Sequence, residues 1–310
     1  MDRLRVAMGR PAKKVARRRL MPRLKPPRSY TFMAMNSPCE VLLDGGTERV
    51  MQMLGRLAEA EARRIEHTYS RYRSDSLLSA VNRSAGMPVA ITPEMAALLD
   101  YADTCFRLSD GLFDITSGVL RRAWRFDETA TKPSASTIAA LLPLIGWEKI
   151  ERGPATVTVP PGMELDFGGL GKEYAVDRVL LMLAEKTDVP VLVNFGGDLR
   201  VTGPRRDGSA WQIAIDAVDP GAESPAAIAL KQGALTTSGD ARRSVVIDGI
   251  RYGHILDPRS GWPVQNAPRS VTVAAPTCME AGIMSTLAMA HGAAAEQFLR
   301  EEQQAAWVLR

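Results

Sequence analysis

A glycine-rich segment at residues 165–178, LDFGGLGKEYAVDR, has the residue types of an anion-binding loop. A strand end is expected to lead into three glycines, and a helix is expected to begin near Lys172. Glycine lets backbone N–H groups approach a ligand closely, and a helix N-terminus favours negative charge. Asp166 and Lys172 flank the glycines and can face a bound ligand. A tight strand-to-helix turn with a surface ion pair explains the same residues, so the segment alone leaves both interpretations open.

A second candidate segment, HILDPRSGWPV at residues 254–264, places His254 before an Asp-Pro loop. Such a histidine can act as a general base or can orient a substrate by hydrogen bonding. Alternatively, Asp257 begins a turn and His254 is a hydrogen-bonded strand residue. The chain contains only three histidines, which excludes a histidine-rich metal site.

The third candidate segment, CMEAGIMSTLAMAHG at residues 278–292, predicts a buried helix interrupted by few polar side chains. Its Ser285–Thr286 pair is either core filler or part of a site completed by another segment. Two further loops, VNFGGDLRVTG and ALTTSGDARRS, carry small and hydroxyl-bearing residues. Each of these loops is explained equally well by close packing of the backbone or by solvent exposure.

The order of the helices and strands expected around these segments indicates a mixed α+β fold rather than a regular βαβ winding. Thr47 and Thr92 are expected to cap long helices, the second of which has Pro93 in its first turn. The first hairpin is expected to turn at residues 36–38, and the IDGI segment is expected to form a second hairpin. Residues 69–86 are rich in Arg, Ser and Asn and are predicted to lie outside the core. Further strands are expected at the following places: ATVTV, PVLVNF, LRVTG, WQIAIDAV, AAIAL, SVTVAA and AAWVL.

Charge is distributed unevenly between the N-terminal 28 residues and the rest of the chain. Residues 1–28 carry eleven Lys and Arg against a single acid, whereas residues 29–310 carry 28 basic and 34 acidic residues. We therefore expect a disordered basic tail followed by one mildly acidic domain, with no basic face for nucleic acid. The chain has no transmembrane run, signal peptide or lipobox in recognisable form, so the sequence as written is expected to stay in the cytoplasm. Its three cysteines indicate a reducing compartment, or thiols that pack as small hydrophobes.

Taken in order, the motifs resemble those of the ApbE family, the FAD:protein FMN transferases. The resemblance covers residues 30–309 and rests on MNSP, YSRYRSDSLLSAVN, SDGLFDITSG, LDFGGLGKEYAVDR, VNFGGDLRVTG, TTSGD, HILDPRSGWPV and STLAM…HG. It implies an α+β fold of largely antiparallel sheets flanked by helices, with FAD held in a central cleft. Members of the family use a divalent metal, usually Mg²⁺, to transfer FMN from FAD to a Thr or Ser hydroxyl of an acceptor protein, with release of AMP. They often act outside the cytoplasmic membrane.

The resemblance also implies roles for individual residues. His254 corresponds to the general base that takes the proton of the acceptor hydroxyl. Metal-ligand positions correspond to the backbone carbonyl of Gly169 and to Ser285 and Thr286. The residues implied to contact FAD are Met35, Phe113, Asp114, Ile115, Asp166, Lys172, Ile255 and Leu256.

The chain departs from the family at residue 282, where the resemblance implies a metal-binding Asp and this sequence has Gly282. A carboxylate is a hard oxygen ligand suited to Mg²⁺, and glycine has no side chain. Two hypotheses follow: an active transferase with a rearranged metal site, or an FAD-binding protein whose transfer is weak or lost. A hydrolase that splits FAD would need the same metal. Gly282→Asp is expected to increase Mg²⁺ affinity.

Overall fold

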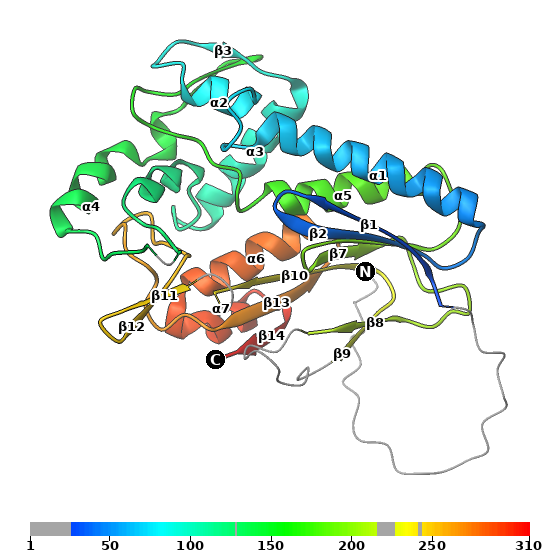
Figure 1. The fold of residues 1–310 in the computed structure, drawn as a ribbon. Helices are drawn as coiled ribbons and strands as arrows, with labels where there is room; N and C mark the ends of the chain where they lie inside the picture. The colour runs from blue at the N-terminus through cyan, green and yellow to red at the C-terminus, as the bar shows by residue number, and fades with distance from the viewer. Residues whose placement is uncertain (1–25, 128, 216–226, 241–243) are drawn as a thin grey trace.

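A seven-stranded antiparallel sheet forms the centre of the protein (Figure 1). The computed structural model describes residues 26–127, 129–215, 227–240 and 244–310. In spatial order the sheet consists of β1 (Arg28–Ala34), β2 (Ser37–Leu43), β6 (Val191–Phe195), β7 (Asp198–Val201), β10 (Gly233–Gly239), β13 (Ser270–Ala275) and β14 (Ala305–Leu309). Every neighbouring pair runs antiparallel. The predicted α+β class with largely antiparallel sheets is confirmed.

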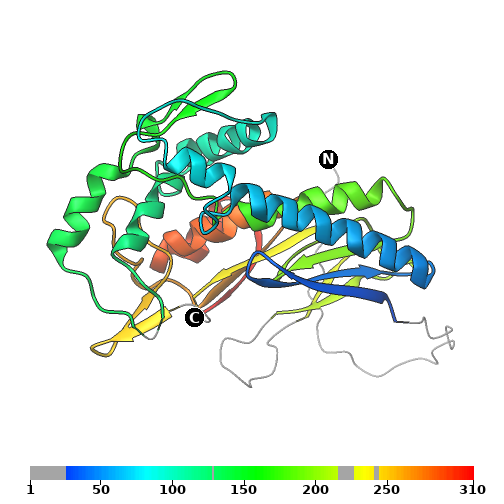
Figure 2. The same ribbon diagram turned by 45° about the horizontal axis from the view of Figure 1, so that its top comes forward.

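Helices cover one face of this sheet. They are α1 (Glu48–Tyr69), α5 (Gly171–Ala184), α6 (Cys278–Ala290) and, beside α6, α7 (Ala295–Glu301). Figures 1 and 2 show α1 and α5 side by side over the sheet, and both contribute to the largest apolar cluster. The opposite face packs against a small hairpin of β8 (Trp211–Ala214) and β9 (Ala227–Leu230). Helices α5 and α6 therefore pack on one face of the sheet, and these two helices carry the candidate site.

A second group of elements lies at one end of the sheet. Its helices are α2 (Leu77–Asn82), α3 (Pro93–Leu108), α4 (Ala135–Leu141) and the short 3₁₀ helices η1 (Ile115–Arg122), η2 (Leu142–Leu144) and η3 (Trp147–Lys149). Its strands β3 (Val89–Ala90), β4 (Glu151–Arg152) and β5 (Thr156–Thr158) form one small sheet. A separate hairpin consists of β11 (Ser244–Ile247) and β12 (Ile250–Gly253). A last 3₁₀ turn, η4 (Gly292–Ala294), joins α6 to α7.

The predicted helix starts are confirmed by their capping geometry. The Thr47 hydroxyl accepts a hydrogen bond from Val50 N at 3.3 Å, and the Thr92 hydroxyl accepts one from Met95 N at 3.1 Å. The IDGI hairpin is also confirmed, because Asp248 and Gly249 both adopt positive φ between β11 and β12. These signals are local to a few residues, which is why the sequence alone predicts them.

Two local predictions need correction. The first hairpin turns at Met35–Asn36, both with positive φ, while Ser37 and Pro38 already pair within β2. Residues 69–86 are not wholly outside the core, because Leu78 and Val81 of α2 are fully buried. A helix of six residues is too short for its apolar period to stand out among polar neighbours.

Residues 1–25 of the predicted tail lie outside the described residues, and β1 begins at Arg28, the last residue assigned to that tail. The three cysteines are buried and unpaired, as expected for thiols that pack as small hydrophobes. Burial raises the pKa of Cys39 and of Cys105 to about 11. Among the described residues, no helix combines the length and apolar character needed to cross a bilayer.

Candidate functional site

The glycine loop at the start of α5 is built onto η1. The backbone N–H of Asp166 donates to the carbonyl of Ile115 at 2.8 Å. One carboxylate oxygen of Asp166 accepts from Gly168 N at 2.9 Å, and the other pairs with the guanidinium of Arg71. A side chain at Gly169 would begin 3.2 Å from the ring of Phe113. Asp166, Ile115, Gly169 and Phe113, which come from two separate segments of the sequence, therefore lie together.

Asp114 holds this arrangement in place. Its carboxylate accepts hydrogen bonds from the backbone N–H and hydroxyl of Thr116, at 2.7 and 2.6 Å, and from Trp147 N at 3.2 Å. Burial raises the pKa of the Asp114 carboxyl, and these three donors oppose that rise. The carboxylate of Asp114 thus fixes the backbone that carries Phe113 and Ile115.

Lys172 pairs with a residue of the central sheet. Its ammonium lies 2.9 Å from the carboxylate of Asp198, the first residue of β7, which is 1% exposed. Burial raises the pKa of Asp198, and the Lys172 charge opposes this shift. The simple ion pair between Asp166 and Lys172 is therefore wrong, since each has a different partner. Sequence reasoning missed Asp198, although it directly follows the double glycine of VNFGGDLR.

Ser285 and Thr286 lie on the side of α6 that faces β10. The Ser238 hydroxyl of β10 lies 2.8 Å from the Ser285 hydroxyl and 3.3 Å from that of Thr286. The Ser285 hydroxyl also donates to the carbonyl of Gly282 at 3.0 Å. The pair is thus part of a hydroxyl cluster from two elements, and Ser238 is a member that sequence reasoning did not select.

Glu173 lies beside Lys172 in the first turn of α5 and points toward α6. Its side chain is buried, with the residue 7% exposed, and its Oε2 atom has no hydrogen-bond partner among the described residues. Burial, followed by the charge of Asp198, raises the pKa of the Glu173 carboxyl to about 7. Sequence reasoning missed this residue. The available signal was its position on the buried side of α5, in helical register with Val176 and Leu180.

The space next to Gly282 is filled by Glu173. A Cβ atom at residue 282 would lie 2.6 Å from Cγ of Glu173, closer than real atoms approach. Gly282→Asp alone would therefore force the Glu173 side chain or the two helices to move. The increase in Mg²⁺ affinity expected from this single substitution therefore requires that Glu173 move aside.

Asp177 fixes α6 against α5. Its two carboxylate oxygens accept from Cys278 N at 2.9 Å and Met279 N at 3.0 Å, the first N–H groups of α6. It also pairs with Arg200 at 2.9 Å. A carboxylate at a helix N-terminus satisfies donors that have no partner within the helix and interacts favourably with the helix dipole.

Asp177→Ala is expected to lower the free energy of unfolding by about 2–4 kcal/mol, because it removes three charged hydrogen bonds and leaves the half-buried Arg200 without this partner. Urea unfolding followed by circular dichroism measures this. Asp177→Asn keeps one acceptor oxygen and should lose less. A loss below about 1 kcal/mol for the alanine variant would show that α6 is held by apolar packing alone.

The segment with His254 follows β12. It lies between the central sheet with its helices and the second group of elements at one end of the sheet. The ring of His254 meets that of Phe126 edge to face, with centroids 6.3 Å apart. Ile255 packs with the cluster beneath α6, and Leu256 packs against Val119 and Leu120 of η1. Leu256 therefore links this segment to the helix that supports the glycine loop.

Met35 occupies the tip of the β1–β2 turn with a φ of 52°. Positive φ is uncommon for a side chain of this kind and costs backbone energy. The Met35 side chain is half-buried against the main apolar cluster.

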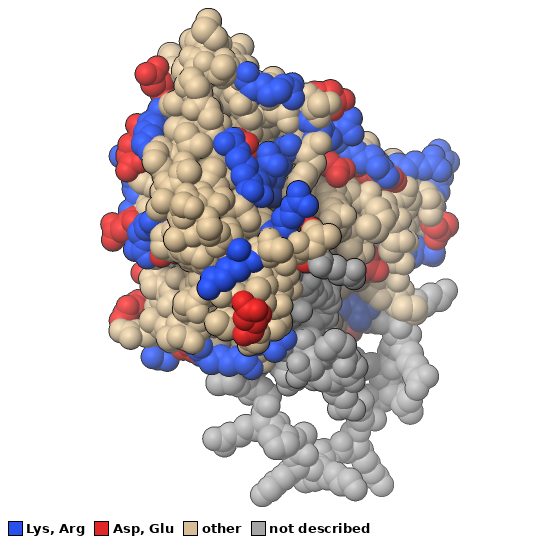
Figure 3. Space-filling model, turned by 60° about the vertical axis from the view of Figure 1, so that its left-hand side comes forward, with Lys and Arg blue, Asp and Glu red and all other residues tan. Residues whose placement is uncertain are grey.

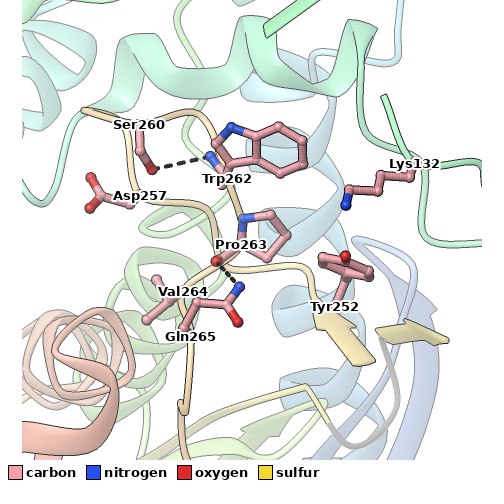
Figure 4. A pocket seen from close by; sticks show the side chains of 8 residues that line it. All are labelled: Lys132, Tyr252, Asp257, Ser260, Trp262, Pro263, Val264 and Gln265. Carbon is pink, nitrogen blue, oxygen red and sulfur yellow. Dashed lines mark hydrogen bonds between the residues drawn. The ribbon is translucent and has the colours of Figure 1, made fainter. Parts of the chain in front are cut away.

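A pocket of about 510 Å³ lies beside the His254 segment (Figure 4). Trp262 and Tyr252 form aromatic walls, and the Lys132 ammonium lies 5.8 and 6.0 Å from their ring centroids. None of the residues predicted to contact FAD lines this pocket. On the side of the molecule that is at the left in Figure 1, Lys and Arg side chains gather around a hollow (Figure 3).

Comparisons with known proteins match this fold and these motifs. A sequence model described as the ApbE family matches residues 35–309. The chain belongs to the ApbE family. A curated ApbE relative from Klebsiella pneumoniae, named FAD:protein FMN transferase, is 30% identical over 84% of this chain and 81% of its own length. A protein of the same name from Vibrio cholerae is 32% identical over 72% of this chain and 69% of its own length.

Solved ApbE structures share the architecture. The ApbE protein of Thermotoga maritima has a TM-score of 0.84 at 27% identity and covers 91% of this chain and 94% of its own. The flavinyl transferase ApbE of Pseudomonas stutzeri has a TM-score of 0.80 at 29% identity. The match covers 92% of this chain and 91% of the Pseudomonas chain. The predicted family membership and ApbE-like fold are both confirmed.

Proposed function

We propose that this protein transfers FMN from FAD to a Thr or Ser hydroxyl of an acceptor protein and releases AMP. The observation that carries the proposal is the match to relatives named FAD:protein FMN transferase over four fifths of both chains. The site supports it, because a glycine loop, a helix N-terminus and a lysine lie together at the start of α5. Transfer of a phosphoryl-linked group depends mainly on positioning and charge neutralisation, which such groups provide.

In this reaction the acceptor oxygen forms a bond to the phosphorus of the FMN half, and the bond from that phosphorus to the AMP oxygen breaks. His254 takes the proton of the attacking hydroxyl, and AMP leaves with the electron pair of the broken bond. The N-terminus of α5 is proposed to bind phosphate oxygens. Met35 and the segment from Phe113 to Ile115 are proposed to contact the flavin, with Asp166 on the adenosine side of FAD and Ile255 and Leu256 as further FAD contacts.

The predicted metal-ligand positions carry oxygen donors that would suit a divalent metal such as Mg²⁺. The hydroxyls of Ser285 and Thr286 and the carbonyl of Gly169 are hard oxygen donors of the kind Mg²⁺ prefers. Beside Gly282, the Oε2 atom of Glu173 is buried and has no hydrogen-bond partner among the described residues. Among the described residues, no three His, Cys, Asp or Glu side chains converge, so carbonyl, hydroxyl and water oxygens would complete the set. When bound, the metal would neutralise charge on the phosphates.

The test is direct. The protein is incubated with FAD, Mg²⁺ and an acceptor that carries a flavinylation threonine, and covalent FMN is detected by fluorescence in a denaturing gel. We expect a fluorescent acceptor band and release of AMP, with no band from an acceptor whose threonine is replaced by valine. Clear FAD binding without any labelled acceptor would instead favour the second candidate, an FAD-binding protein that has lost transfer. The observation behind this second candidate is the absent side chain at Gly282.

A further inference from the structure

Glu173 is the acidic side chain of the site that the proposed reaction has not yet used. It lies in the first turn of α5, it is buried, and its Oε2 atom has no hydrogen-bond partner among the described residues. An unpaired buried carboxylate is costly, so it persists where some group compensates it or where it serves a function. Lys172 is adjacent, but its ammonium is directed to Asp198 at 2.9 Å.

Helix register places this carboxylate opposite Gly282. Asp177 contacts the first residues of α6, Cys278 and Met279. Glu173 lies one turn before Asp177 on α5, and Gly282 lies one turn after Cys278 on α6. The two helices thus run antiparallel along this contact, and Glu173 and Asp177 share one side of α5 at i and i+4 spacing.

The absence of a side chain at residue 282 makes room for Glu173. A Cβ atom there would lie 2.6 Å from Cγ, 3.3 Å from Cδ and 3.3 Å from Oε1 of Glu173. The glutamate carboxyl therefore occupies the volume into which a side chain at residue 282 would extend. Thr286 lies one turn further along α6, and side chains on a helix lean toward its N-terminus, which brings the Thr286 hydroxyl toward the same space.

We propose that Glu173 supplies from α5 the anionic oxygen that Gly282 cannot supply from α6, and that with Thr286 it forms the divalent-cation site of this protein. The carboxylate that the resemblance implies at residue 282 of α6 is then replaced by the carboxylate of Glu173, which reaches the same space from α5. The inference rests on the proposed function only for the identity of the cation, and its test measures cation binding without FAD or acceptor.

The experiment measures Mn²⁺ binding to the full-length chain from the electron paramagnetic resonance signal of free Mn²⁺, with Mg²⁺ competition. Glu173→Gln is expected to weaken Mn²⁺ binding at least about tenfold, because it removes the anionic ligand at nearly constant volume. Mg²⁺ is expected to raise the melting temperature of the wild type, and Glu173→Gln should abolish this rise. Glu280→Gln is the matched control, since Glu280 is an exposed acid two residues from Gly282 on α6, and it should leave both readouts unchanged.

This replacement is tested by three more variants. Glu173→Gly should lose Mn²⁺ binding, Gly282→Asp alone should fold less stably because two side chains compete for one space, and the double variant should recover binding to within about threefold of the wild type. A Glu173→Gln protein that binds Mn²⁺ like the wild type, or a wild type that binds none, would overturn the inference. Mn²⁺ binding through Glu173 without FMN transfer would contradict the proposed function and leave the inference standing.

Discussion

His254→Ala is expected to lower the rate of FMN transfer by about 10²–10⁴-fold while FAD still binds, because a positioned general base contributes about that much to a rate. The side chain follows β12, half-buried, and Leu256 two residues later packs on η1, which joins the glycine loop through Ile115. The imidazole is therefore carried by a segment that is anchored to the nucleotide-binding elements. Transfer is measured as covalent FMN on the acceptor per unit time, and FAD binding by quenching of flavin fluorescence.

His67→Ala is the matched control, because His67 lies exposed in the last turn of α1. It should leave transfer unchanged. If His254→Ala retains more than about a tenth of the wild-type rate at saturating FAD and acceptor, His254 is not the base. If it loses FAD binding instead, its role is to position the nucleotide.

The parts of the fold that depend on neighbouring residues could be predicted from the sequence. Thr47 and Thr92 cap their helices through contacts three residues away, and Asp248–Gly249 forms its hairpin within four residues. Amphipathic helices and strand alternation are likewise encoded within a short window. The core location of α2 was missed because its six residues span less than two helical turns.

The partners of the predicted site residues could not be predicted from the sequence. An ion pair between Asp166 and Lys172 was one of the two interpretations left open for the glycine loop, yet their partners are Arg71 and Asp198, 95 and 26 positions away. No local pattern specifies such pairs, since they depend on which strand lies beside which helix. Glu173 shows the same limit: the sequence shows an acid in the first turn of α5, and only the packing shows that it lies against Gly282.

Lys172→Met is expected to lower the free energy of unfolding by about 3–5 kcal/mol at pH 8 in the presence of EDTA, because it leaves a buried carboxylate without its partner. Asp198 is 1% exposed, and its other hydrogen bond, from Thr237 N, is long at 3.3 Å. Glu173 depends on the same ammonium, which opposes the rise in its pKa. Loss of Lys172 therefore removes the cation from two buried acids at once, and urea unfolding measures the cost.

The cost should depend on pH in a defined direction. Burial raises the folded-state pKa of Asp198 and of Glu173, the latter to about 7. A carboxyl with a raised folded-state pKa favours folding below its unfolded-state pKa, and this contribution is lost as pH rises through the folded-state value. The variant should therefore lose more stability at pH 8 than at pH 5, where Glu173 binds a proton and no longer needs the cation. Adding Asp198→Asn to Lys172→Met should restore part of the loss at pH 8. An equal loss at both pH values would show that Lys172 stabilises the protein through its methylene packing rather than its charge.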